Sequence, residues 1–360
     1  MYTGDKEQTE TKILNRAIDA VARETGLHLY LDEQGVREGP YNLDAVLGIE
    51  GRNERLAAEV KRWAQQANLG ALINQVQELP MKGLLVADYI NPKMAEKLRE
   101  QQVQFIDTVG NAYIDIPPVY ILVTGKRKPK AEAGQPKGDA NRTFDRTGLK
   151  VVFAILCHPE LVAETYREIA EVAGVALGTV GWVINGLKEA GFIFEYGHKK
   201  GRKLVDYKRL LDRWVETYPE KLRPKVHIGD FFADDPYWWQ ELNIQEFQAY
   251  WGGEIAAAHY TDYLKPAVAT VYLPEETKSK FLARNRLRAV PEKMGGKIGK
   301  VKLYQRFWND TATPLLEIAK PSVVPPVLAY ADLIATADPR NQETARIIYD
   351  EYIARHNRQG

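Results

Sequence analysis

The chain of 360 residues has a single cysteine, Cys157, which excludes an internal disulfide and any metal site built from several cysteines. It lacks an apolar run near the roughly 20 residues that a membrane-spanning helix needs. Its first residues, Met1 to Thr11, are polar and of mixed charge, unlike the apolar core of a signal peptide. We therefore expect a cytoplasmic protein that does not enter a membrane.

The net charge is only +1, but the basic residues are unevenly distributed. Residues 126–146 carry seven Lys/Arg against three Asp/Glu, residues 196–210 carry six against one, and residues 278–306 carry ten against one. Local basic blocks of this kind suit a polyanion such as DNA. The alternative is that each block only solvates a surface.

Composition and hydrophobic periodicity predict a multidomain protein of α/β and α+β class. Residues 1–125 are expected to form a mixed sheet covered by helices, and residues 126–147 a basic linker rich in glycine and proline. The expected helices are 9–24, 64–78 and 92–102. The expected strands are 27–31, 41–49, 55–62, 83–90, 103–106 and 112–116. Residues 148–225 and 226–360 are expected to be two further domains.

The middle domain shows the pattern of a winged helix–turn–helix. Helices are expected over 149–157, 165–173 and 176–190, with a capping box at Thr165 and Glu168 and a turn at Gly174-Val175. Strands over 192–196 and 203–205 would then form a basic hairpin. We expect the motif to bind double-stranded DNA through Arg167, Thr179, Asn185, Lys188, Lys199, Lys200, Arg202 and Lys203. A winged helix that binds only protein is the alternative.

A possible catalytic group lies in the first domain. Glu59 and Lys61 are two residues apart on a strand and so share a face, while Asp44 lies on the adjacent, hairpin-linked strand. Two carboxylates can hold Mg²⁺, and the lysine can stabilise developing negative charge on a phosphodiester. This pattern resembles the restriction-endonuclease-like superfamily, in which Asp is followed by Glu-x-Lys. Glu24 matches an extra carboxylate of some members. The alternatives are a surface ion pair or a nuclease-like fold without catalysis.

The third domain, 226–360, has an α+β pattern. A strand is expected over 269–273, a basic strand pair over 290–307, and a capped helix over 341–356. The aromatic residues Trp238, Trp239, Tyr250 and Trp251 favour a core or a protein interface over a stacking platform for bases.

Four segments together resemble bacterial AbiEi-type regulators, the antitoxins of type IV toxin–antitoxin systems. They are GLLVADYI (83–90), FIDTVGNAYI (105–114), WGGEIAA (251–257) and YADLIATADPRN (330–341). The resemblance implies a DNA-binding transcriptional regulator that represses its own operon. It also implies a functional link to a nucleotidyltransferase toxin, whose effect such antitoxins counter without a stable complex.

Two classes of function follow. The first is a regulator that is not an enzyme and needs no cofactor, with a homodimer on palindromic sites as one option. The second is a Mg²⁺-dependent endonuclease or nickase of the PD-(D/E)xK type, with Asp44, Glu59 and Lys61 as catalytic residues and Asp44 and Glu59 as metal ligands. A DNA-binding protein of plasmid replication or recombination remains a further alternative.

Overall fold

The structure is a computed structural model that describes residues 3–38, 41–62, 64–127, 143–196, 201–290, 299–309 and 321–359. The chain divides into two compact units, Met1–Lys137 (unit 1) and Gly138–Gly360 (unit 2). Both combine sheets with helices, which confirms the expected multidomain class of α and β structure. The finer division of residues 148–360 into two domains stays a prediction.

Unit 1 contains a seven-stranded sheet whose strands follow one another in chain order. The first three strands are antiparallel, the next two run parallel to β3, and the last two are antiparallel again. They are β1 (Leu29–Glu38), β2 (Tyr41–Ile49), β3 (Arg55–Lys61), β4 (Gly83–Ala87), β5 (Gln104–Asp107), β6 (Ala112–Ile116) and β7 (Val119–Val123). Helix α1 (Thr3–Thr25) precedes β1, α2 (Leu69–Gln77) joins β3 to β4, and α3 (Pro92–Glu100) joins β4 to β5.

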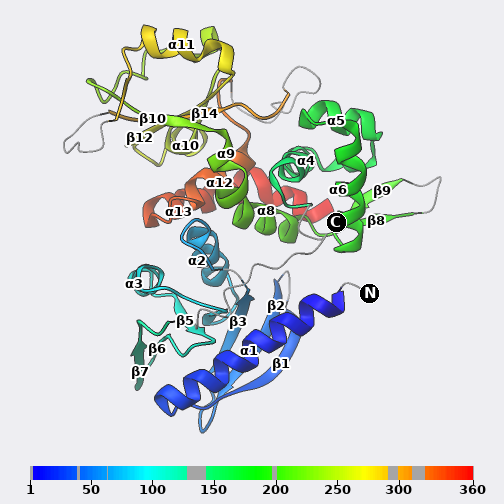
Figure 1. The fold of residues 1–360 in the computed structure, drawn as a ribbon, viewed down its shortest axis with the longest axis vertical. Coiled ribbons are helices and arrows are strands. Elements are labelled where there is room, and N and C mark those ends of the chain that lie inside the picture. Colours follow the sequence, from blue (N-terminus) through cyan, green and yellow to red (C-terminus); the bar gives the residue numbers. More distant parts are fainter. Residues whose placement is uncertain are drawn as a thin grey trace. The chain divides into compact units, whose positions relative to one another are not determined.

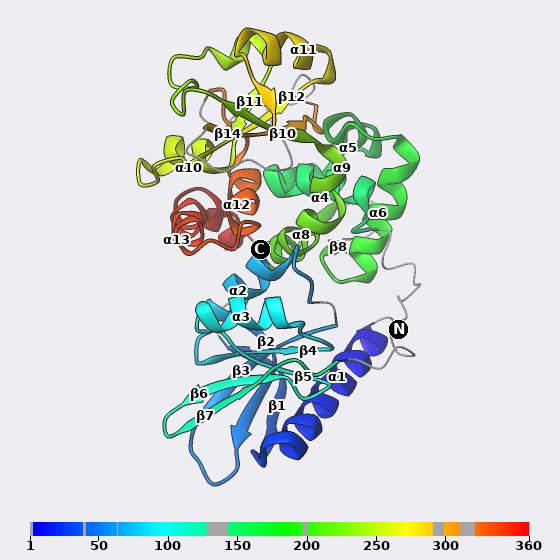
Figure 2. The ribbon, with the colours of Figure 1, turned by 60° about the vertical axis from the view of Figure 1, so that its left-hand side comes forward.

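Helices cover both faces of this sheet. In β4, Leu84 and Val86 pack with α1, whereas Leu85 and Ala87 pack with α2 and α3. This division follows from the alternation of side chains along a strand. Figure 2 shows α1 on one side of the sheet and α2 and α3 on the other.

Three expectations for unit 1 need correction. The first strand extends to Glu38 rather than ending at residue 31, because its polar second half pairs with β2 without a hydrophobic pattern of its own. Helix α2 begins at Leu69, five residues later than expected, because a turn precedes it. The sheet also has a strand after Ile116 that we did not expect, β7.

Unit 2 begins with the elements expected of the middle domain. They are α4 (Arg146–Cys157), α5 (Tyr166–Ala173), α6 (Leu177–Glu189), β8 (Ile193–Glu195) and β9 (Arg202–Leu204). A short 3₁₀ helix that we did not expect, η3 (Pro159–Ala163), lies between α4 and α5. The capping box is confirmed: the N–H of Glu168 donates to Thr165 Oγ1 at 3.3 Å, and the N–H of Thr165 donates to Glu168 Oε2 at 2.9 Å. Gly174, with φ of 60°, ends α5 in the left-handed conformation that glycine adopts readily.

The end of the expected linker belongs to the fold of unit 2. Helix α4 starts at Arg146 because Asp145 accepts hydrogen bonds from the N–H groups of Thr147 and Gly148. The preceding residue, Phe144, is buried, and its ring lies 6.0 Å from that of Phe192. Residues 128–142 of the linker lie outside the described residues.

The rest of unit 2 contains a five-stranded sheet in the order β11-β12-β14-β10-β13. The strands are β10 (His227–Ala233), β11 (Tyr250–Gly252), β12 (Val268–Leu273), β13 (Arg288–Ala289) and β14 (Gly299–Gln305). The helices are α8 (Tyr207–Lys221), α9 (Arg223–Val226), η4 (Ile244–Phe247), α10 (Gly253–Thr261), α11 (Glu275–Arg284), α12 (Pro326–Ile334), α13 (Pro339–Ile348), η5 (Tyr349–Ile353) and η6 (Ala354–Gln359). In Figure 1, α11 lies on one side of this sheet, and α12 and α13 lie on the other.

Two expectations for this sheet have definite outcomes. The two basic strands, β13 and β14, are not a pair, because β10 lies between them and bonds to both. The aromatic cluster is a core: Trp251 is buried, and Trp238 and Trp239 pack against it at ring distances of 5.9 and 6.3 Å. Tyr250 contacts Trp308 at 5.8 Å.

Among the described residues, no single helix is long and apolar enough to cross a membrane. Helices α5 and α6 meet the length and composition criteria only together, as a pair bent by 105°.

Candidate functional site

Helices α5 and α6 are joined at a sharp angle. Their directions differ by 105°, and only Gly174, Val175 and Ala176 separate them. In a DNA-binding helix–turn–helix, the two helices likewise meet at about 90–120° and are joined by a short turn that often contains glycine. The β8–β9 hairpin follows directly, with Ile193 opposite Leu204 and Glu195 opposite Arg202.

The predicted contact residues of the two helices differ in their availability. Arg167 on α5 and Asn185 on α6 are exposed, and Thr179 near the start of α6 is partly exposed. Lys188 is already engaged, because its Nζ lies 2.6 Å from Glu195 Oε2 on β8. The buried side of α6 anchors it to the core through Val180, Val183, Ile184 and Leu187.

The basic hairpin is held in place by one of its own arginines. Arg202 Nε donates to the carbonyl oxygen of Val162 at 2.8 Å, and the guanidinium also donates to the carbonyl oxygen of Glu164. The same guanidinium lies 4.6 Å from the ring centre of Tyr166. Arg202 therefore positions the hairpin, whereas Lys203 is exposed. Two further predicted contacts, Lys199 and Lys200, lie outside the described residues.

An acidic groove lies beside α5. It has a volume of about 280 Å³ and is lined by His158, Glu160, Leu161, Glu164, Glu168, Glu171 and Val172. Four glutamates in one groove repel phosphates. The groove therefore disfavours anionic ligands, a feature that the sequence did not predict.

The segment that follows β14 packs against α4 and α5. The backbone N–H of Asn309 donates to the carbonyl oxygen of Val172 at 3.3 Å. The side-chain amide of Asn309 donates to the carbonyl oxygen of Glu171, also at 3.3 Å. The rings of Phe307 and Trp308 lie 5.1 and 5.9 Å from Phe153 of α4. Residues that follow β14 thus bind the last carbonyl groups of α5.

A buried polar network ties α8 and α9 to α12. Asp332 Oδ1 accepts hydrogen bonds from Tyr218 at 3.1 Å and from Arg223 Nε at 3.2 Å, and its Oδ2 accepts one from Tyr272 at 2.9 Å. Burial raises the pKa of Asp332, and the charge of Arg223 and these hydrogen bonds oppose the shift.

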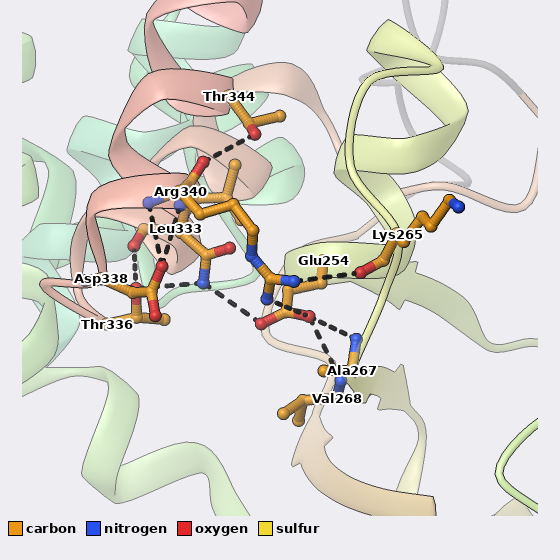
Figure 3. Close-up of polar contacts among 10 residues, drawn as sticks. Glu254, Lys265, Ala267, Val268, Leu333, Thr336, Asp338, Arg340 and Thr344 are labelled. Atoms are coloured by element: carbon orange, nitrogen blue, oxygen red, sulfur yellow. Dashed lines mark hydrogen bonds and ion pairs between the residues drawn. The ribbon is translucent and has the colours of Figure 1, made fainter.

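Glu254 of α10 is the centre of a second buried cluster (Figure 3). Its Oε2 accepts hydrogen bonds from the N–H groups of Ala267, at 2.6 Å, and Val268, at 3.3 Å. Its Oε1 accepts one from the amide of Asn341 at 3.2 Å, and Arg340 lies 3.5 Å from Oε2. The contacts join two of the four segments that resemble AbiEi-type regulators, 251–257 and 330–341.

The comparison with protein families covers both of these segments. Residues 203–354 match the AbiEi antitoxin family. The matching model is described as "Transcriptional regulator, AbiEi antitoxin, Type IV TA system". The resemblance inferred from the sequence is therefore confirmed for this part of the chain. A comparison with curated proteins and with solved structures gave no match.

The matched residues, 203–354, are called the AbiEi segment below. The segment starts in β9, the second strand of the hairpin, and includes α8, α9, the five-stranded sheet, α12 and α13. The quoted segments 83–90 and 105–114 lie outside it, in unit 1, so the resemblance there stays a prediction.

Unit 1, outside the AbiEi segment, brings Asp44, Glu59 and Lys61 together. Ala45 pairs with Ala58 across β2 and β3, so Asp44 and Glu59 occupy the next facing positions. Lys61 Nζ lies 2.8 Å from Glu59 Oε1, and the N–H of Val60 donates to Asp44 Oδ2 at 2.7 Å. Burial, and next the Glu59 carboxylate, raise the pKa of Asp44 to about 7, and Lys61 opposes this shift.

The expected role of Glu24 is wrong. Its Oε2 lies 2.5 Å from Lys126 Nζ, near the C-terminal end of α1. The carboxylate of α1 that acts on Asp44 is Glu10, which raises the pKa of Asp44 by its charge. Fourteen residues of helix span about 21 Å, so Glu10 and Glu24 cannot serve one site.

The carboxylates of Asp44 and Glu59 could supply some, but not all, of the ligands that a hard cation needs. They supply the oxygen ligands that Mg²⁺ prefers, and Mg²⁺ commonly uses one or two carboxylates, with water and phosphate completing its shell. In the described parts of the chain, no group of three or more His, Cys, Asp or Glu side chains is arranged to hold a metal. A cation here would thus need ligands from water or from DNA.

Proposed function

We propose that this chain is a DNA-binding transcriptional regulator that acts as a type IV antitoxin and represses its own operon. The observation that carries the proposal is the position of the helix–turn–helix and hairpin, which directly precede and partly overlap the AbiEi segment. Both lie in unit 2, and residues 307–309 of the AbiEi segment bind α4 and α5.

The proposed contacts follow from exposure and charge. Thr179 and Asn185 of α6 would read base edges in the major groove, and Lys203 would bind backbone phosphates. Lys199, Lys200 and Arg167 would add phosphate contacts, whereas Arg202 and Lys188 would hold the hairpin against the core. A toxin of the nucleotidyltransferase class would be the functional partner.

A binding titration tests the first step. The labelled probe is a duplex from the region upstream of the chain's own coding sequence, and a scrambled duplex of the same composition is the control. We expect tighter binding to the upstream duplex. If about six phosphates are neutralised, the affinity should fall about 10³-fold between 50 and 200 mM salt. Equal affinity for both duplexes would refute operator recognition, and a flat salt response would refute phosphate binding.

A reporter assay tests repression itself. The same upstream region drives a reporter in bacteria, with or without the protein. Wild type should lower expression, and Asn185→Ala should relieve it, because α6 would lose a base contact. Lys265→Ala, which changes an exposed lysine between α10 and β12, is the matched control and should repress like wild type.

The second candidate function is Mg²⁺-dependent DNA cleavage, and the observation behind it is the convergence of Asp44, Glu59 and Lys61 on β2 and β3. When bound, Mg²⁺ would supply an acidified water for attack on the phosphodiester. Asp44 and Glu59 would hold the cation, and Lys61 would stabilise the charge on the phosphate.

A plasmid assay separates the two functions. Supercoiled plasmid is incubated with Mg²⁺ and either wild type or Lys61→Ala, and the samples are deproteinised before electrophoresis. Nicked or linear DNA with wild type but not with the variant would establish an enzyme. Intact supercoiled DNA in both lanes would refute cleavage and leave unit 1 without a catalytic role.

A further inference from the structure

We propose that Phe194 and Tyr196 of the β8–β9 hairpin form an aromatic wedge, which enters the minor groove of double-stranded DNA and unstacks a base step. The inference rests on the proposed function, because it takes α6 to lie in the neighbouring major groove. It assigns a task to two exposed aromatic side chains that the base-edge and phosphate contacts described above do not use.

The hairpin has an inner and an outer face. On the inner face, Ile193 and Leu204 lie opposite each other and are buried, and Arg202 donates to backbone carbonyl oxygens in and after η3. Phe194 and Lys203 form the next facing pair. Because side chains alternate along a strand, this pair belongs to the outer face, away from the helices.

The outer face is rich in apolar side chains, although the solvent-facing side of a hairpin is normally polar. Phe194, Tyr196 and Val205 are 54%, 46% and 50% exposed. The ring centres of Phe194 and Tyr196 lie 4.9 Å apart, and the rings are inclined by 71°, so the two side chains form one aromatic pair. Large apolar side chains gathered on one exposed face indicate a surface used for binding.

The charges around the aromatic pair favour a nucleic acid as the partner. Lys203 is exposed directly across from Phe194, and residues 196–210 carry six Lys/Arg against one Asp/Glu. Glu195, the acidic residue of β8, is already paired with Lys188 of α6 at 2.6 Å. Aromatic rings beside cations suit a partner that offers bases beside phosphates.

The position of the hairpin favours the minor groove of a duplex. Strands β8 and β9 lie beside α6 (Figure 1), and a groove of the other kind flanks every major groove. Proteins that bind the minor groove frequently insert apolar side chains between base pairs and partly unstack them. Unstacking is easiest at flexible TA and CA/TG steps, so we place the wedge at such a step.

The hairpin is also held in place before DNA arrives. Arg202 fixes it through two carbonyl oxygens and through the ring of Tyr166, which lies 4.6 Å from the guanidinium. A wedge on a fixed support loses less conformational freedom on binding than one on a free loop. This support is expected to let the two rings compensate for the stacking that the DNA loses.

A binding titration with the upstream duplex separates the wedge from a phosphate contact. Phe194→Ala should weaken binding about tenfold, because a stacked ring is lost, but leave the salt slope unchanged. Phe194→Tyr keeps the ring and should bind like wild type. Tyr237→Ala is the matched control, because it removes a 64% exposed aromatic side chain outside the hairpin. Wild-type affinity for Phe194→Ala would overturn the proposal.

Permanganate oxidation of the bound duplex measures unstacking directly. The reagent attacks thymines that have lost their stacking, and TA and CA/TG steps all contain a thymine. We expect a newly reactive thymine with wild type and Tyr237→Ala, and none with Phe194→Ala at saturating protein. Tight binding by wild type without a reactive thymine would overturn the wedge and leave the regulator intact. Failure of wild type to bind any duplex would overturn both.

Sedimentation velocity of the protein without DNA tests the competing partner for this face, another protein chain. Wild type and Phe194→Ala should sediment alike, because the wedge is expected to contact DNA. A wild-type oligomer that Phe194→Ala dissociates would assign the outer face to a protein interface and overturn the proposal.

Discussion

Arg223 of α9 and Asp332 of α12 form an ion pair of 3.2 Å, although the two residues lie 109 positions apart in the chain. Asp332 is buried, and the side chain of Arg223 is only 19% exposed. Tyr218 and Tyr272 complete the hydrogen bonds of the carboxylate. The pair joins the helices that follow the β8–β9 hairpin to the last part of the AbiEi segment.

Removing the carboxylate should destabilise unit 2 strongly. Asp332→Ala leaves the Arg223 guanidinium without its carboxylate. It also leaves one tyrosine hydroxyl without an acceptor, because Tyr218 and Tyr272, 2.7 Å apart, can donate only one hydrogen bond to each other. We expect the change to cost about 3 to 5 kcal/mol. Urea unfolding followed by tryptophan fluorescence measures the loss. Asp350→Ala, at an exposed aspartate, is the control and should change the midpoint little. A loss below about 1 kcal/mol for Asp332→Ala would show that the network contributes little.

Two neighbouring basic residues of the hairpin should behave differently when changed to alanine. Arg202→Ala removes charged hydrogen bonds to Val162 and Glu164, so it should lower the unfolding free energy by about 1 to 3 kcal/mol. Lys203→Ala should leave stability unchanged, weaken all duplexes alike and lower the salt slope by about 1. Thermal unfolding and a salt titration of DNA binding measure the two effects. If Lys203→Ala binds DNA like wild type, the hairpin is not a phosphate contact.

Glu254→Gln tests the cluster in Figure 3. A carboxamide presents an NH₂ group where the carboxylate accepts from Ala267, Val268 and Asn341, so at least one buried donor loses its acceptor. We expect a loss of about 2 to 3 kcal/mol in unfolding free energy. Glu276→Gln, at an exposed position of α11, serves as the reference and should be neutral. Equal unfolding curves for the two variants would contradict this role of Glu254.

The stability of unit 1 should depend on pH through Asp44. Its pKa is about 7 in the folded chain and near 4 when unfolded, so the folded state holds the proton more tightly. Between these values stability falls as pH rises, by up to about 1.4 kcal/mol per pH unit, and it levels off above pH 7. Asp44→Asn should remove this pH dependence of the unfolding free energy. Urea unfolding of wild type and Asp44→Asn from pH 4 to 8 measures the effect. If the difference in unfolding free energy between the two proteins is the same at every pH, the raised pKa of Asp44 is refuted.

Local patterns were sufficient to predict helices α5 and α6 with their tight turn, and the approach of Asp44, Glu59 and Lys61. The capping box involves residues three apart, and the Glu59–Lys61 contact joins residues two apart on one strand. The pairing of Asp44 with Glu59 follows from a hairpin between consecutive strands. Interactions over short distances in sequence leave a pattern that can be recognised in a single chain.

Features that depend on distant segments could not be predicted in this way. Tyr218 and Asp332 are 114 residues apart, and no periodicity links them. The choice of Glu10 over Glu24 depends on which end of α1 lies near Asp44, and this is decided by packing. The pairing of β10 with both β13 and β14 likewise depends on tertiary order rather than on the composition of the strands.

The contact between Asn309 and α5 has a consequence for synthesis on the ribosome. Asn309 is made 138 residues after Glu171, whose carbonyl oxygen it binds. At about 5 to 20 residues per second, α5 waits roughly 7 to 30 s for this partner. A nascent or prematurely terminated chain that ends before residue 309 therefore has α5 and α6 without this contact, and the contact forms only when the polypeptide is nearly finished.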